Sequence, residues 1–168
     1  MKILLIILGG VAIFVVVFIV YFSWQAWQAE VLDSIVSVPD DDPDMAAAIQ
    51  KAKETLPDFV GILQTPTTGE RFLLLKAKFV DGVDIEHMWV ADLVKDGDGF
   101  KGVVADEPKV VKTVTFKQPV KIARDQITDW MATQDGKVKG AFTTRVLLTK
   151  MTPEQKKVFL RSMPYTLE

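Results

Sequence analysis

The sequence predicts an α+β domain behind an N-terminal transmembrane helix. An uncharged apolar run covers Ile3 to Phe22, apolar residues recur every three or four positions after Pro43, and a period of two begins at Arg71. We therefore expect a transmembrane anchor over residues 1–29, an acidic linker over residues 30–42 and a single α+β domain over residues 43–168.

The apolar run Ile3 to Phe22 is long enough to cross a bilayer. At about 1.5 Å per residue it reaches roughly 30 Å, the thickness of the hydrocarbon core. A cleaved signal peptide has a shorter apolar core and small residues before the cut, whereas a cut after Ala29 would place Trp27 three residues back. Aromatic residues typical of a membrane interface follow the run: Tyr21, Trp24 and Trp27. We expect an uncleaved anchor in the lipid bilayer through residues 3–22.

The orientation of the anchor follows from the few charges beside it. Lys2 is the only basic residue before the span, and the first one after it is Lys51. Because basic residues near a span stay inside, we expect a single-pass inner (plasma) membrane protein with its N-terminus inside. Its domain would then be periplasmic or extracytoplasmic. The absence of Cys fits either compartment and excludes disulfides and thiol catalysis.

The net charge of −2 conceals blocks of opposite sign. Residues 81–107 carry eight acidic and two basic residues, whereas residues 108–161 carry twelve basic and four acidic ones. The favoured interpretation is that oppositely charged strands are neighbours in one sheet. Alternatively, the basic half meets anionic lipid, a cell-wall polymer or an envelope protein partner. We expect no nucleic-acid partner, because no basic motif with stacking aromatic residues occurs.

An amphipathic helix is expected to open the domain. Asp42 and Pro43 suit the N-cap and the first helical position. The apolar stripe then comprises Met45, Ile49, Ala52, Leu56, Phe59 or Val60, and Leu63. Pro57 should break or kink the helix near Leu56.

The alternating segments predict an antiparallel sheet of five to seven strands. Leu73, Leu75, Ala77 and Phe79 share one face of a first strand, and Ile85, His87, Trp89, Ala91 and Leu93 share one face of a second. A third strand returns over residues 100–105, and further extended stretches cover residues 110–116 and 120–123. The strongest hairpin signal joins residues 129–133 to 138–148 through Gln134-Asp135-Gly136-Lys137. Thr152 and Gln155 predict the start of a short C-terminal helix that ends near Pro164.

Several segments together resemble a bacterial family. They are Asp41-Asp42-Pro43-Asp44-Met45, Leu56-Pro57-Asp58-Phe59, Phe79-Val80-Asp81-Gly82, Glu86-His87-Met88-Trp89-Val90, Ile127-Thr128-Asp129-Trp130-Met131 and Gly140-Ala141-Phe142-Thr143-Thr144-Arg145. They resemble the YegJ-like family, domain of unknown function 2314, over roughly residues 40–148. The resemblance implies no defined activity and no assigned catalytic residues.

His87 and Trp89 are the first candidate ligand-binding residues. His87 is the only histidine and could act as a general base. However, its neighbour Glu86 should point to the opposite face of the strand, so the two cannot form a dyad. A packed, structural histidine is the favoured interpretation.

The remaining candidates are Asp129, Trp130 and Arg145. We expect Asp129 either to cap the turn before it or to pair with Arg145 across the hairpin. Alternatively, Arg145 binds an anionic group beside His87 and Trp89. Trp130 is more typical of a core residue than of a ligand platform.

No established activity follows from these residues. No cofactor or metal is expected, because one histidine without Cys shows no ligand spacing and no Gly-rich loop opens a helix. The leading hypothesis is a membrane-anchored, non-enzymatic binding or interaction module of the bacterial envelope. The alternatives are a hydrolase-like enzyme that uses His87 with a distant carboxylate, and an inhibitor or immunity-type protein.

Overall fold

The computed structural model describes residues 21, 23–28, 30–31, 38–39, 41–66, 71–134, 137–163, 165 and 167. The chain divides into two compact units, Val38–Lys150 with Met163–Glu168 and Met1–Ser37 with Met151–Ser162. The predicted transmembrane span, apart from Tyr21, lies outside the described residues. Within the ranges described, no helix is long and apolar enough to cross a membrane.

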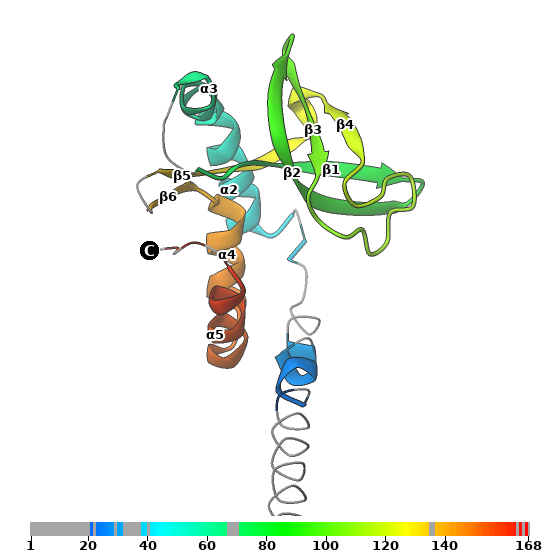
Figure 1. The fold of residues 1–168 in the computed structure, drawn as a ribbon, viewed down its shortest axis with the longest axis vertical. Coiled ribbons are helices and arrows are strands. Elements are labelled where there is room, and N and C mark those ends of the chain that lie inside the picture. Colours follow the sequence, from blue (N-terminus) through cyan, green and yellow to red (C-terminus); the bar gives the residue numbers. More distant parts are fainter. Residues whose placement is uncertain are drawn as a thin grey trace, which may run out of the picture. The chain divides into compact units, whose positions relative to one another are not determined.

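The larger unit is built on a six-stranded antiparallel sheet (Figure 1). Its strands are β1 (Leu73–Asp81), β2 (Asp84–Asp96), β3 (Gly99–Val104), β4 (Pro119–Ile122), β5 (Ile127–Gln134) and β6 (Lys137–Gly140). They lie in the order β4-β3-β2-β1-β5-β6, so β5 pairs with β1 rather than with β4, its predecessor in the chain. The expected α+β class and antiparallel sheet are confirmed.

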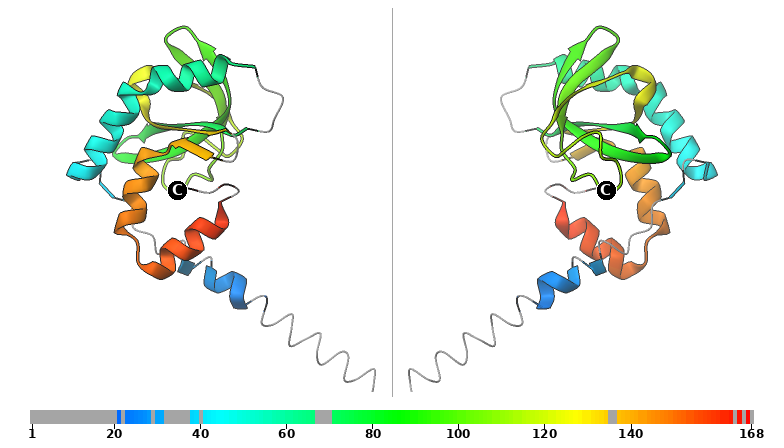
Figure 2. Two further views of the ribbon diagram at one scale, coloured as in Figure 1. Left: turned by 90° about the vertical axis from the view of Figure 1, so that its left-hand side faces the viewer. Right: turned by 90° about the vertical axis from the view of Figure 1, so that its right-hand side faces the viewer.

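Two consecutive helices cover one face of this sheet. They are α2 (Pro43–Glu54) and α3 (Leu56–Gln64), which run along one side of the strands (Figure 2). Oδ1 of Asp42 accepts hydrogen bonds from the N–H groups of Asp44 and Met45, so the predicted N-cap is confirmed. The helices separate at Thr55, because Pro57 cannot continue α2.

The core lies between these helices and the sheet. Ala52, Leu56 and Phe59 of the helices are buried against residues on one face of the strands. Those strand residues include Leu75, Ala77, Phe79, Met88, Val90, Phe100, Val104, Ile127, Trp130 and Ala132. The alternate residues of each strand face the other way, and they form what we call the second face of the sheet.

Two predictions for the part of the sheet between β1 and β4 are wrong. Leu93 leaves the row of His87 and Trp89 and packs against the core, because β2 has a bulge between Ala91 and Val94 with Asp92 at a φ of 51°. Residues 110–116 form no strand but lie in the loop between β3 and β4.

Side-chain carboxylates of the β1–β2 hairpin hold that loop in place. Glu86 accepts hydrogen bonds from the N–H groups of Lys109, Val110 and Val111, and Asp81 accepts one from that of Lys112. Backbone N–H groups that would pair with a strand are therefore satisfied by side chains.

The segment expected as a long last strand is mostly helical. β6 ends at Gly140, and α4 (Phe142–Lys150) follows. Phe142, Thr144, Val146 and Leu148 alternate as in a strand, but tertiary contacts override that pattern. The decisive contact comes from Asp129, whose carboxylate accepts the first N–H groups of α4.

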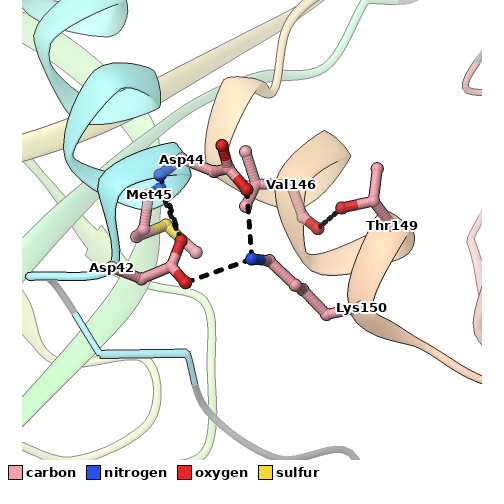
Figure 3. Close-up of polar contacts among 6 residues, drawn as sticks. All are labelled: Asp42, Asp44, Met45, Val146, Thr149 and Lys150. Atoms are coloured by element: carbon pink, nitrogen blue, oxygen red, sulfur yellow. Dashed lines mark hydrogen bonds and ion pairs between the residues drawn. The ribbon is translucent and has the colours of Figure 1, made fainter.

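The far end of α4 is fastened to the start of α2. Nζ of Lys150 lies 3.1 Å from Oδ2 of Asp42 and 3.0 Å from Oδ2 of Asp44 (Figure 3). Asp42 therefore serves both as the N-cap of α2 and as an ion-pair partner of α4.

The smaller unit contains α5 (Pro153–Ser162) and helical residues between Tyr21 and Val31. Thr152 and Gln155 exchange hydrogen bonds between side chain and backbone at the start of α5. This is the capping box that the sequence predicted.

Candidate functional site

One part of the second face follows the β1–β2 hairpin. Cross-strand pairing places Lys76 opposite Trp89, Lys78 opposite His87 and Val80 opposite Ile85. Because these positions alternate with core residues, their side chains lie in one continuous row. We call this row the β1–β2 strip: Lys76, Lys78, Val80, Ile85, His87 and Trp89.

The Lys76 ammonium contacts both an aromatic ring and a hydroxyl group. It lies 5.0 Å from the centroid of the Trp89 ring and 3.3 Å from Oγ1 of Thr143. A cation over the face of an indole ring is attracted by the ring quadrupole. Trp89 and Thr143 thus hold a half-buried positive charge at a fixed place on the sheet.

Two carboxyl groups lie within the electrostatic reach of Lys76. Asp129 is 0 % exposed, and burial raises its pKa although hydrogen bonds and the charge of Lys76 oppose the shift. Burial likewise raises the pKa of Asp106, whose Oδ2 accepts a hydrogen bond from the N–H of Trp89. Such shifted groups around one cation are common at functional sites, and they also occur in structural networks.

His87 is half-buried in the strip. Its Nδ1 lies 3.0 Å from Oγ1 of Thr128, and that hydroxyl donates a longer hydrogen bond to the carbonyl of Lys76. Glu86 points to the other face and binds the β3–β4 loop, as strand alternation predicts. The contacts described for His87 are therefore those of a side chain that orders β1, β2 and β5.

Asp129 connects the strip to α4. Its carboxylate accepts hydrogen bonds from the N–H groups of Trp130, Phe142 and Thr143 and from Oγ1 of Thr143, the last at 2.6 Å. The sequence predicted that Asp129 either caps the turn before it or pairs with Arg145. The described contacts of its carboxylate are instead with Trp130 and with the start of α4, because a helix begins where the partner strand was predicted.

Trp130 and Arg145 lie away from the strip. Trp130 is buried in the core, where its ring contacts Phe59 and Phe142 and its Nε1 donates to Oγ1 of Thr55. The Arg145 guanidinium donates to the carbonyls of Gly140 and Val138 on the edge strand β6. Of the sequence-predicted residues, the structure thus brings together His87, Trp89 and Asp129.

The hairpin end of the strip is apolar and exposed. Val80 is 57 % exposed, Ile85 48 % and Val83, in the turn between the strands, 96 %. Aliphatic side chains this open beside charged ones are typical of a contact surface.

Sequence reasoning missed Lys76, Asp106 and Thr143 as members of this cluster. The sequence did indicate where Lys76 lies, because Lys76 and Lys78 alternate with core positions and must therefore lie together on the opposite face of the strand. Asp106 and Thr143 belong to segments whose conformation the sequence did not reveal. In the ranges that the structure describes, no group of three or more His, Asp or Glu side chains could hold a metal ion.

Comparisons with known proteins identify a family without a described activity. A family model described as an uncharacterised protein conserved in bacteria (DUF2314) matches residues 42–165. The uncharacterised protein YegJ of Escherichia coli K12 is 29% identical over 134 residues, which cover 80% of this chain and 86% of YegJ. A Neisseria meningitidis serogroup B protein, named as an ankyrin repeat protein, is 34% identical over 89 residues, which are 51% of this chain and 35% of that protein. No solved structure matches the chain.

Proposed function

The chain belongs to the DUF2314 family of bacterial proteins, and on that premise we propose that it is a non-enzymatic binding module of the cell envelope. The β1–β2 strip is its binding surface. The observation that carries the proposal is the Lys76 ammonium, fixed over the Trp89 ring in a row that ends in exposed aliphatic residues.

The chemistry of the strip suits binding better than bond cleavage. A positive charge, an indole ring and exposed aliphatic side chains lie in sequence along two strands. An aromatic anchor beside a partly desolvated charge is typical of the energetic centre of an interface. The Thr143 hydroxyl donates to the Asp129 carboxylate at the start of α4, but it belongs to a residue only 3 % exposed.

Crosslinking from the strip tests this proposal. A photo-reactive amino acid replaces Ile85 in the full-length protein in its native membrane, and a matched control places it at Phe116 in the β3–β4 loop, which is also exposed. We expect one dominant adduct from position 85 that is absent from position 116 and is lost on Lys78→Glu. Identical adducts from both positions, or an adduct indifferent to Lys78→Glu, would contradict a binding role for the strip.

The proposed location rests on the apolar run Ile3 to Phe22 and on the aromatic residues after it. We propose that this run anchors the protein in the inner membrane with the domain in the periplasm. An alkaline phosphatase fused after Glu168 should be active, because that enzyme requires an oxidising compartment. An inactive fusion together with an active cytoplasmic reporter at the same position would reverse the orientation. Recovery of the full-length protein from the soluble fraction would refute the anchor.

A further inference from the structure

We propose that a cavity beside the junction of α2 and α3 binds a small organic carboxylate, an apolar body with one negative charge. The cavity has a volume of about 450 Å³ and is lined by Lys53, Leu56, Arg124 and Asp125. Pockets that hold small molecules measure roughly 300–1,000 Å³ and combine apolar walls with a few polar groups. None of the four residues belongs to the β1–β2 strip, so this is a second site that does not depend on the proposed binding surface.

Two separate parts of the fold form the cavity. Lys53 lies in the last turn of α2, and Leu56 is the first residue of α3, at the break between the two helices. Arg124 and Asp125 lie in the 3-10 turn η1 (Arg124–Gln126), which connects β4 to β5. The cavity therefore exists only where the helix pair and this connection of the sheet come together.

The η1 turn is held in place by hydrogen bonds and by its buried neighbours. Oε1 of Gln126 accepts the N–H of Ala123 at 2.8 Å, and the N–H of Gln126 donates to the carbonyl of Ala123. On either side of the turn, Ile122 and Ile127 are buried in the core. A wall whose backbone is already ordered reduces the entropy that a ligand must remove on binding.

Most of the cavity wall is apolar. Leu56 is buried in the core and offers little of its own surface. The rest of the apolar wall must come from the hydrocarbon stems of Lys53 and Arg124, whose charged groups remain in contact with water. An aromatic ring or a short alkyl chain would leave water for this wall.

The charges of the lining favour a single negative charge on the ligand. Lys53 and Arg124 bring two positive charges to one cavity and Asp125 brings one negative charge, which leaves one net positive charge. Across the part of the chain that the structure describes, neither cation forms an ion pair. Two cations that share a cavity repel each other, and a bound anion attracts both. The planar fork of the guanidinium matches the two oxygens of a carboxylate.

The test uses NMR on the full-length protein in a non-ionic detergent. Phenylacetate is the probe, and phenylacetamide, which has nearly the same shape without the charge, is its matched control. We expect phenylacetate to shift the methyl signals of Leu56 and the Nε–H signal of Arg124 saturably, without shifting the methyl signals of Val83 in the β1–β2 turn. Phenylacetamide should bind at least about tenfold more weakly, because it lacks the hydrogen bonds of a charged group.

Substitutions in the lining test the two cations. Lys53 and Arg124 are both exposed, so replacing either should leave the core intact. We expect Arg124→Gln and Lys53→Gln each to weaken phenylacetate binding about two- to fivefold, the range of a partly exposed ion pair. Lys121→Gln is the control and should leave binding unchanged, because Lys121 alternates with buried Ile122 and lies on the second face of the sheet.

The inference fails if Leu56 and Arg124 show no saturable shift, or if their shifts are matched by those of Val83. It also fails if phenylacetamide binds as tightly as phenylacetate, a comparison that does not depend on the folding of any variant. Lining substitutions that act no differently from Lys121→Gln would remove the role of the two cations. Tighter binding of doubly charged phenyl phosphate would overturn the assignment to a carboxylate.

Discussion

Asp129 joins two elements through a single carboxylate. It lies on β5, is fully buried and accepts four hydrogen bonds, three of them from Phe142 and Thr143 at the start of α4. Negative charge near a helix N-terminus is favourable, and hydrogen bonds to a charged acceptor are the strong ones. We therefore regard Asp129 as a positioning residue for α4 and Thr143, and through Thr143 for Lys76.

Asp129→Asn should destabilise the fold. The amide retains one acceptor oxygen and turns a donor toward N–H groups that already need acceptors, which costs about 1–3 kcal/mol. Urea unfolding of the purified protein measures the loss, with Asp125→Asn at an exposed position as the control. Equal unfolding free energies for both variants would contradict this role.

The carboxyl groups of Asp129 and Glu86 should titrate on opposite sides of their ordinary values. Burial raises the pKa of Asp129 above 3.8. Burial also acts to raise the pKa of Glu86, but hydrogen bonds from three backbone N–H groups outweigh it and hold that pKa below 4.5. Carbon-detected NMR titration of both side chains in one sample measures the midpoints, and a midpoint for Asp129 below 3.8 or one for Glu86 above 4.5 would contradict the prediction.

The two shifts change stability with pH in opposite senses. Asp129 binds its proton more tightly in the folded state, so its contribution is fully present below pH 3.8 and is lost as pH rises through its folded pKa. Glu86 contributes above pH 4.5 and loses that contribution as pH falls through its lowered pKa.

Residue-level prediction from the sequence succeeded where strand alternation decides the outcome. It placed His87 and Trp89 on one face and Glu86 on the other, because a period of two leaves no alternative. It could not place Asp129 or Arg145, since their partners depend on α4. The β-branched residues Thr143, Thr144 and Val146 favour a strand locally, and only the long-range cap shows that the segment is helical.

The junction between β6 and α4 depends on one glycine. Gly140 has a φ of +76°, and a Cβ added there would lie 2.2 Å from the carbonyl oxygen of Trp130. Ala141 follows at a φ of 55° and donates its N–H to that same carbonyl. The chain thus turns from strand to helix in a space that admits no side chain.

Gly140→Ala should cost more stability than Gly82→Ala. Both positions have positive φ, which costs a residue with a Cβ about 1–2 kcal/mol. Only Gly140 adds a clash with backbone, since a Cβ at Gly82 would meet nothing within 4 Å. Thermal unfolding of the two variants isolates the effect of space, and similar losses would show that the close approach to Trp130 is unimportant.

At the scale of the whole domain, the order of the strands is the feature that the sequence could not supply. Consecutive strands β1, β2, β3 and β4 pair in turn, as a meander predicts, but β5 returns to the free edge of β1. The period-two pattern of β5 does not by itself specify which strand it pairs with. The choice is made by burial of Trp130 and Ile127 under α2 and α3, which is a property of the assembled core.

The ion pairs that Lys150 of α4 makes with Asp42 and Asp44 at the start of α2 should stabilise the fold less in high salt. Lys150 pairs with Asp42 and Asp44 at the surface. Its hydrogen bonds to Asp44 and Asp42 raise the pKa of Lys150. The hydrogen bond between Lys150 and Asp42 also lowers the pKa of Asp42. We expect Lys150→Gln to lower the urea midpoint slightly in low salt and to have no effect near 1 M NaCl, where charges are screened beyond about 3 Å. Lys121→Gln is the control. A fall in the urea midpoint of Lys150→Gln that persists in high salt would contradict an electrostatic contribution of these ion pairs.

Arg145 affects whether two copies of this domain can pair their sheets edge to edge. Its guanidinium donates hydrogen bonds to carbonyls of β6, one edge strand of the sheet. The positive charges of Lys137 and Lys139 on that strand repel the same strand of another copy. The opposite border, β4, begins with Pro119, which has no N–H to offer. Neither edge strand therefore favours pairing with a strand of another molecule. If these proteins are anchored in a membrane, they meet often and in restricted orientations. Such crowding need not start fibril formation through the sheet edges. Association would then use the flank of the β1–β2 hairpin instead.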